Sequence, residues 1–152
     1  MTLDQIDKRL LGFLQEDAKQ TNKSLALQLN LSVTAVYERI KKLERNGYIK
    51  KYVALVNKQK LNLGFTVFCH IKLAKHSEEN ISKFEARVFQ LPEVMECFHV
   101  SGEYDYLLKV VVQDMDHFRE FMVSKVTSIE HVGSTTSSFT IHQVKNTTAM
   151  EL

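Results

Sequence analysis

The side chains best suited to binding chemistry lie close together between positions 32 and 45. This stretch carries hydroxyl groups, a phenol, carboxylates and four cations. Cations neutralise phosphates, and small polar side chains near the start of a helix can reach base edges in the DNA major groove. We therefore expect a DNA contact surface made of Ser32, Thr34, Ala35, Tyr37, Glu38, Arg39, Lys41, Lys42 and Arg45.

The apolar residues of the same stretch predict which side chains face outward. They recur at helical spacing, and so indicate one face turned to a core, at Val33, Val36, Ile40 and Leu43. Base edges would then be met by Thr34 and Ala35, aided by Tyr37 and Glu38. Phosphates, which fix register without specifying sequence, would be bound by Ser32, Lys41, Lys42 and Arg45. Arg39 lies beside the apolar stripe and is either a helix-packing residue or a phosphate clamp.

Two more helices are expected before this one. The first has apolar residues at helical spacing and should end near residues 17–19. Thr2 and Gln5 fit a capping box at its start, with Asp4 and Asp7 as a weaker alternative.

A tight turn should join the second helix to the third. The second helix fits Asn22–Leu29, and Asn30 tolerates the left-handed conformation that ends a helix. Ser32 can cap the third helix, Val33–Arg45, before Gly47 closes it. The pattern predicts a helix-turn-helix, whose second helix enters the major groove.

The charge is divided unevenly along the chain. Residues 1–60 hold twelve Lys/Arg and six Asp/Glu, a net charge of +6, whereas residues 61–152 hold eight and twelve, a net charge of −4. A basic first part favours contact with a polyanion, and the acidic remainder suggests a separate task.

The rest of the chain alternates strand and helix patterns. A stretch rich in β-formers predicts a strand at 48–56, and the polar segment 57–64 predicts a domain boundary. The later patterns predict, in order, a strand at 65–73, a helix at 77–91, strands at 94–100 and 106–112, a helix after Asp114 that turns Met115 inward, and a strand at 135–144.

This βαββαβ order is the ferredoxin-like arrangement. We expect an α+β fold in three parts. A winged-type helix-turn-helix domain occupies residues 1–50, a strand and linker occupy 51–64, and a ferredoxin-like domain for effector binding and oligomerisation occupies 65–152.

Two motifs resemble the Lrp/AsnC family of regulators, also called feast/famine regulators. The first runs from Leu31 to Glu44 and continues with Gly47-Tyr48-Ile49. The second, Val100–Lys109, looks like the family's effector domain, the RAM domain. The resemblance implies dimers formed through the RAM sheet, octamers of four dimers, and amino acids that bind between dimers and shift assembly or DNA affinity.

The resemblance also implies an effector site. Its residues would be Gly102, Glu103, Tyr104, Asp105, Thr135 and Ser137. Free N–H groups at a glycine turn can hold an α-carboxylate, and Asp105 or Glu103 can pair with an α-ammonium. The alternative is that Gly102 only forms a hairpin turn and that Asp105 only caps it.

Other classes of site find little support in the sequence. The six histidines and two cysteines have no metal-binding spacing, so we expect no metal and no cofactor. We expect no catalysis either, because no nucleophile elbow, Walker loop or dinucleotide fingerprint is present. Cys69 and Cys97 fit reduced core thiols. No secretory signal or membrane-length apolar run is found, so we expect a cytoplasmic protein.

The expected function is sequence-specific transcription regulation by duplex DNA binding, modulated by an amino acid. Two other functions remain open. One is an architectural chromosomal protein with little sequence preference. The other is a small-molecule enzyme or allosteric subunit that uses the N-terminal helices as a docking module.

Overall fold

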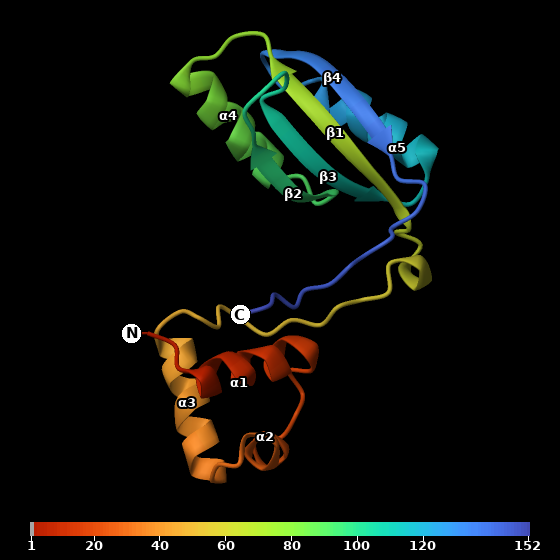
Figure 1. Ribbon diagram of the computed structural model, residues 1–152. Helices are drawn as coiled ribbons and strands as arrows, with labels where there is room; N and C mark the ends of the chain where they lie inside the picture. Colours follow the sequence, from red (N-terminus) through yellow and green to blue (C-terminus); the bar gives the residue numbers. More distant parts are fainter. Residues whose placement is uncertain (1) are drawn as a thin grey trace. The chain divides into compact units, whose positions relative to one another are not determined.

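The computed structural model describes residues 2–152 (Figure 1). The chain forms two compact units. One runs up to Leu55 and includes Val144–Leu152, and the other is Val56–Gln143. No helix in the described residues is long and apolar enough to cross a membrane.

The first unit consists of three helices around a small apolar core. They are α1 (Gln5–Glu16), α2 (Asn22–Leu29) and α3 (Val33–Arg45). Their contact is made by fully buried side chains from all three helices, Leu10, Leu25, Val36 and Leu43. The predicted ranges of α2 and α3 are confirmed.

The helix-turn-helix forms as its turn residues predict. Asn30 lies in the left-handed region, with φ 55° and ψ 50°, and ends α2. The Ser32 hydroxyl accepts the N–H of Ala35 at 3.1 Å and caps α3. Gly47 follows α3 with φ 74°, a conformation that favours glycine.

Helix α1 is capped by the pair that the sequence analysis ranked second. The Asp4 carboxylate accepts the N–H of Asp7 at 2.7 Å, and the Asp7 carboxylate accepts the N–H of Asp4 at 3.3 Å. The preferred box of Thr2 and Gln5 is wrong, because α1 begins only at Gln5. Both carboxylates also form ion pairs with Arg39 on α3.

The predicted strand at 48–56 is wrong. In the described chain this segment has no regular structure, and no β-hairpin wing follows α3; the next element is the short 3₁₀ helix Gln59–Leu61. Its β-forming side chains lie largely in solvent, with Leu55 74% exposed and Val56 64% exposed. An extended segment becomes a strand only when another strand pairs with its N–H and C=O groups, and this chain supplies none there.

The second unit is a four-stranded antiparallel sheet with two helices. In chain order it contains β1 (Phe65–Leu73), α4 (Glu78–Phe89), β2 (Val94–His99), β3 (Tyr106–Val112), α5 (Met115–Phe121), a π-helical turn (Met122–Val126) and β4 (Val132–Phe139). The strands lie in the order β2-β3-β1-β4. The predicted ferredoxin-like βαββαβ arrangement is confirmed, with β3 and β1 central.

The last strand lies earlier in the chain than predicted. It covers Val132–Phe139 rather than 135–144. Its ladder with β1 runs from Leu73–Val132 to Val67–Phe139, so the pairing reaches the beginning of β1 at about residue 139. The residues that follow have no strand to pair with.

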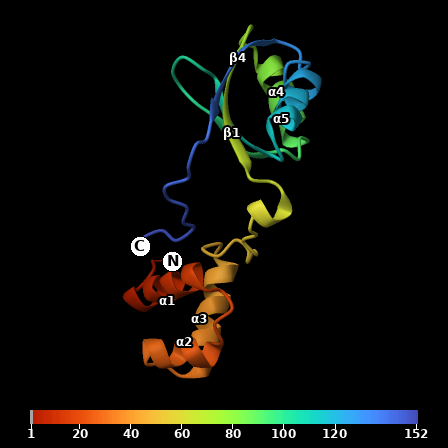
Figure 2. The same cartoon turned by 90° about the vertical axis from the view of Figure 1, so that its right-hand side faces the viewer.

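The two helices cover one face of the sheet, and no helix of the described chain covers the other (Figure 2). Alternate residues of β1 point into the helix-covered core, where Val67, Cys69 and Ile71 are fully buried beside Phe84 and Phe121. The opposite face stays open and carries Phe68, His70, Leu107 and Phe98, which the strand register places side by side.

Three residues expected in a core are exposed instead. Val33 is 47% exposed and Met115 is 43% exposed. Each is the first residue of its helix, at the margin of the packed layer. Cys97 is also exposed, because β2 is an edge strand.

The C-terminal segment Val144–Leu152 packs with the helical unit. The Gln15 side chain on α1 donates to the Met150 carbonyl at 3.1 Å and accepts the Met150 N–H at 2.8 Å. One amide side chain thus satisfies both backbone groups of a residue 135 positions away. The helical unit is therefore discontinuous in sequence.

Candidate functional site

The outer face of α3 is the most accessible part of the helix-turn-helix. It is exposed at seven of the nine predicted contact residues, namely Ser32, Thr34, Tyr37, Glu38, Lys41, Lys42 and Arg45. Ala35 is half-buried. Because α3 places its apolar stripe against α1 and α2, this polar face is free to meet a ligand as broad as a DNA groove.

The beginning of α3 suits an anion. The Ser32 cap takes the N–H of Ala35, and the Ser32 carbonyl takes the N–H of Val36. The N–H groups of Val33 and Thr34 come earlier in the first turn, where a helix offers them no acceptor. They lie at the positive end of the helix dipole, so a backbone phosphate can bind there while Thr34 faces the bases.

Lys41 is held in place by neighbouring side chains. Its Nζ lies 2.8 Å from Glu44 Oε2 and 5.8 Å from the centre of the Tyr37 ring. The Tyr52 hydroxyl donates to the other Glu44 oxygen at 3.1 Å. The hydrogen bond and charge of Glu44 raise the pKa of Lys41, so this cation stays protonated. A phosphate must compete with Glu44 for it.

Arg39 has a structural role in this geometry. Its Nη1 lies 2.6 Å from Asp7 Oδ1 and 2.7 Å from Asp4 Oδ2. The Asp7 side chain is only 4% exposed, so its charge needs this partner. Of the two alternatives for Arg39, the contacts match the helix-packing residue: the guanidinium ties α3 to the start of α1.

The predicted effector turn is formed, and Asp105 caps the neighbouring strand. Gly102 has φ 130°, a conformation that favours glycine. Asp105 Oδ2 accepts the N–H of Leu73 at 2.7 Å and lies 3.4 Å from His76 Nε2. Glu103 is exposed at the tip. The turn thus presents one free carboxylate and one that is already hydrogen-bonded.

The hydroxyls predicted on the last strand do not meet Tyr104. The Tyr104 hydroxyl lies 3.1 Å from Thr136 Oγ1, and its ring lies 5.0 Å from the His70 ring, on the open face of the sheet. Thr135 and Ser137 pair with residues of the helix-covered face, and Ser137 Oγ donates to Cys69 Sγ at 3.8 Å. Residues on alternate positions of a strand point to opposite faces. Thr135 and Ser137 therefore lie on the sheet face opposite to the Tyr104 ring.

Several contributing residues were missed by the sequence analysis. Asp4 and Asp7 hold Arg39, Glu44 holds Lys41, and His76 lies against Asp105. Only the Lys41–Glu44 spacing, three residues along a helix, carries a local signal that could have revealed its pair. The others depend on contacts between distant segments.

No group of histidine, cysteine and acidic side chains in the described residues is arranged to hold a metal ion. Cys69 is fully buried, and burial raises the pKa of its thiol to about 11. This thiol is a core group rather than a nucleophile.

Comparison with known families assigns both units. Residues 66–150 match the model of the Lrp/AsnC ligand binding domain. The chain belongs to the Lrp/AsnC family. Residues 3–50 match the model of a winged helix-turn-helix DNA-binding domain, which covers α1 to α3. A family member with these two parts is a DNA-binding transcription regulator and not an enzyme.

Curated relatives of this Lrp/AsnC protein match it over nearly its whole length. The DNA-binding transcriptional activator DecR of Escherichia coli is 39% identical over 150 residues, which cover 99% of each chain. The leucine-responsive regulatory protein of Rhizobium meliloti is 36% identical and covers 99% of this chain and 96% of its own.

Solved structures agree with the fold of this family member. A Neisseria meningitidis transcriptional regulator, NMB0573, solved as an L-Met complex, has a TM-score of 0.94 and 34% identity over 98% of this chain and 96% of its own. An AsnC family regulator from Agrobacterium tumefaciens has a TM-score of 0.93 and 38% identity over 97% and 96%.

The Arg39 contacts generate a stability prediction. Replacing Arg39 with methionine leaves the buried Asp7 carboxylate without its cation, which should lower the free energy of unfolding by about 3 kcal/mol. Urea unfolding followed by circular dichroism measures the change. Lys42→Met, which removes a cation from an exposed position, should cost less than about 0.5 kcal/mol. Equal losses for the two variants would show that the Arg39 network does not stabilise the unit.

The same contacts give a pH dependence. The N–H of Asp7 and the Arg39 guanidinium lower the pKa of Asp4 below its ordinary value of 3.8. Asp4 therefore contributes stability above that pH, and the contribution disappears as the pH falls through its lowered pKa. As the pH falls below about 4, the free energy of unfolding should therefore decrease less in the Arg39→Met variant than in the unchanged protein. Urea unfolding at a series of pH values measures the difference.

Proposed function

We propose that α3 reads a specific duplex sequence in the major groove and that an amino acid bound to the sheet unit changes DNA affinity. The observation that carries the DNA part is the exposed polar face of α3 behind a left-handed Asn30 turn. Four cations and a helix N-terminus lie on or beside this face. Backbone phosphates supply affinity to such a surface, whereas base edges supply specificity.

Contacts to DNA divide into two kinds in this proposal. Thr34 and Ala35, near the start of α3, meet base edges, and Tyr37 and Glu38 lie one turn further along. Phosphates are bound by Ser32, Lys41, Lys42 and Arg45. Arg39 contributes indirectly, because its pairing with Asp7 fixes the direction of α3.

The effector part of the proposal concerns the turn that contains Gly102. Glu103 is exposed there, and the contacts of the Asp105 side chain with Leu73 and His76 both use Oδ2, which leaves Oδ1 for a ligand. An α-ammonium can bind these carboxylates, and turn N–H groups can hold an α-carboxylate. A related regulator was solved with L-Met, which supports an amino acid as the class of effector.

The open sheet face supports a homodimer. Phe68, Leu107 and Phe98 lie on it without a covering helix, and such a face gains stability when a second sheet packs against it. The exposed apolar side chains of residues 52–56 offer a second surface to a partner chain. The proposal includes assembly of four dimers into an octamer, which the family resemblance implies, and a cytoplasmic location, where DNA is accessible.

The proposed mechanism is thermodynamic linkage. An effector that binds one assembly or conformation better than another shifts DNA occupancy by its difference in affinity for the two states. By reciprocity, operator DNA must change effector affinity by the same factor.

Two substitutions separate base reading from phosphate binding. Lys42→Ala should weaken binding about equally on every duplex and lower the slope of log affinity against log salt by about 1. Thr34→Val should change the preference at one or two base pairs by about 1–3 kcal/mol and leave the salt slope unchanged. Fluorescence anisotropy titrations on a set of single-base operator variants measure both. A uniform effect of Thr34→Val across that set would contradict base contact by the start of α3.

Asp105→Asn tests the effector site. The amide keeps an acceptor for the Leu73 N–H but removes the charge that an α-ammonium needs. We expect unchanged DNA affinity without amino acid and a loss of the amino-acid effect on DNA binding. Glu130→Gln removes a charge from an exposed residue of the same unit and should keep the full response. A full response from Asp105→Asn would place the effector elsewhere.

A further inference from the structure

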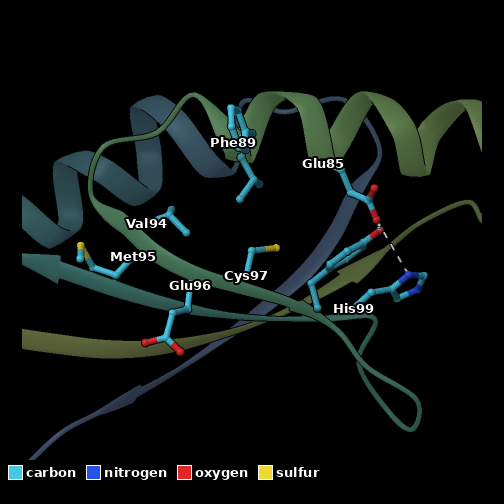
Figure 3. Close-up of a pocket in the computed structure, with 9 residues that line it drawn as sticks. Glu85, Phe89, Val94, Met95, Glu96, Cys97 and His99 are labelled. Atoms are coloured by element: carbon cyan, nitrogen blue, oxygen red, sulfur yellow. Dashed lines mark hydrogen bonds and ion pairs between the residues drawn. The ribbon is translucent and has the colours of Figure 1, made fainter. Parts of the chain in front are cut away.

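A pocket lies beside the edge strand, between α4 and β2 (Figure 3). Its volume is about 420 Å³, within the usual range for small-ligand sites. One end is lined by Glu85, His99 and Tyr106. The other is apolar and is formed by Val88, Phe89 and Met95.

The polar end of this pocket holds a carboxylate, Glu85, that can accept further hydrogen bonds. Glu85 Oε1 accepts the Tyr106 hydroxyl at 2.8 Å and lies 3.9 Å from His99 Nδ1. Three other glutamates of this unit are neutralised by lysines, in the pairs Glu79–Lys83, Glu93–Lys125 and Glu96–Lys109. No Lys or Arg forms an ion pair with Glu85 in the described chain, and both of its side-chain contacts use the same oxygen, Oε1. A carboxylate in this setting selects a cation.

The aromatic rings beside Glu85 favour the same ligand charge. His99 and Tyr106 stack with their centres 4.6 Å apart and their planes inclined by 21°. Tyr106 is almost fully buried, with the Phe84 ring also 4.6 Å from its own, so the ring left to a ligand is that of His99. A π system attracts a cation that sits against its face. Hydrogen bonding to Glu85 keeps the Tyr106 phenol neutral, since burial and that carboxylate raise the pKa of Tyr106.

The apolar end of the pocket determines the character and length of the rest of the ligand. Phe89 is 87% exposed and Met95 is 62% exposed, whereas Val88 is buried beneath them. Glu85 and Phe89 are four residues apart on α4, which corresponds to about 6 Å along the helix axis. That length matches an ammonium group joined to an apolar chain of four or five atoms.

We infer that this pocket binds a small primary ammonium compound with a short apolar chain, distinct from the effector site at the Gly102 turn. The ammonium donates to Glu85 and lies against the His99 ring, and the chain covers Val88 and Met95. Amino acids with apolar side chains and simple alkylamines share this chemistry.

Cys97 provides a direct reporter of occupancy. Cys97 is an exposed residue that lines the pocket, whereas Cys69 is fully buried and its burial raises the pKa of the thiol to about 11. A maleimide should therefore label Cys97 far faster than Cys69, and Cys97→Ser should remove the fast reaction. A bound ligand covers the thiol and slows its labelling.

The test compares three probes on the full chain: 3-methylbutylamine, L-leucine and 3-methylbutanol. We expect at least tenfold slower Cys97 labelling with saturating amine and no effect of the alcohol, which lacks the ammonium. Protection by L-leucine as well would identify amino acids as ligands, and protection by the amine alone would identify amines. Unchanged labelling with both the amine and L-leucine would overturn the proposal.

Two variants make the result specific. Glu85→Gln keeps an acceptor for Tyr106 but removes the charge, and should weaken protection at least tenfold. Asp105→Asn should leave protection intact, so that failure at this pocket and failure at the Gly102 turn are distinguishable. The methyl resonance of Met95 gives a second readout, and its shift should saturate with the amine at the same concentration as protection. Equal protection of the Glu85→Gln variant would overturn recognition by this carboxylate.

Discussion

The ion pair between Arg39 and the buried Asp7 carboxylate fixes the element on which function depends. It joins the middle of α3 to the first turn of α1 at 2.6 Å, while Asp4 caps α1 and binds the same guanidinium. A buried carboxylate without a partner is costly, so the geometry holds only when α3 lies in this direction across α1. The outer face of α3 is thereby oriented by side chains other than those proposed to contact DNA.

The sheet unit follows a second constraint, the one-sided covering of its strands. Helices α4 and α5 bury one face, and the other leaves Phe68 and Leu107 half-buried and Phe98 exposed. The segment at 48–56 also has apolar side chains without a covering element. It is rich in β-forming residues but has no partner strand in the described chain. Both features are understandable in a chain that associates with copies of itself, which is why oligomerisation forms part of the proposed function.

Local chemistry made much of the fold predictable. Asn30, Ser32 and Gly47 each act through their own backbone or a neighbour three residues away, so the boundaries of α2 and α3 could be read directly. Patterns of alternation predicted the βαββαβ order, although β4 shifted because its length is set by β1. Features that need distant partners escaped prediction. Nothing in the sequence around Asp7 indicates that it pairs with Arg39, 32 residues further on, and nothing around Gln15 indicates its hydrogen bonds to Met150. The exposure of the polar face of α3 was predictable for the same reason, whereas the sheet face to which Thr135 and Ser137 turn depends on strand register.

The central claim is that the α3 face distinguishes one DNA sequence from others. It is tested most directly by titrating the purified protein onto a duplex from the upstream region of its own gene and onto a scrambled duplex, at physiological salt. The account predicts at least about a thousandfold tighter binding to the native sequence. Tight but equal binding to both duplexes would contradict it and would indicate an architectural protein that uses the same basic surface.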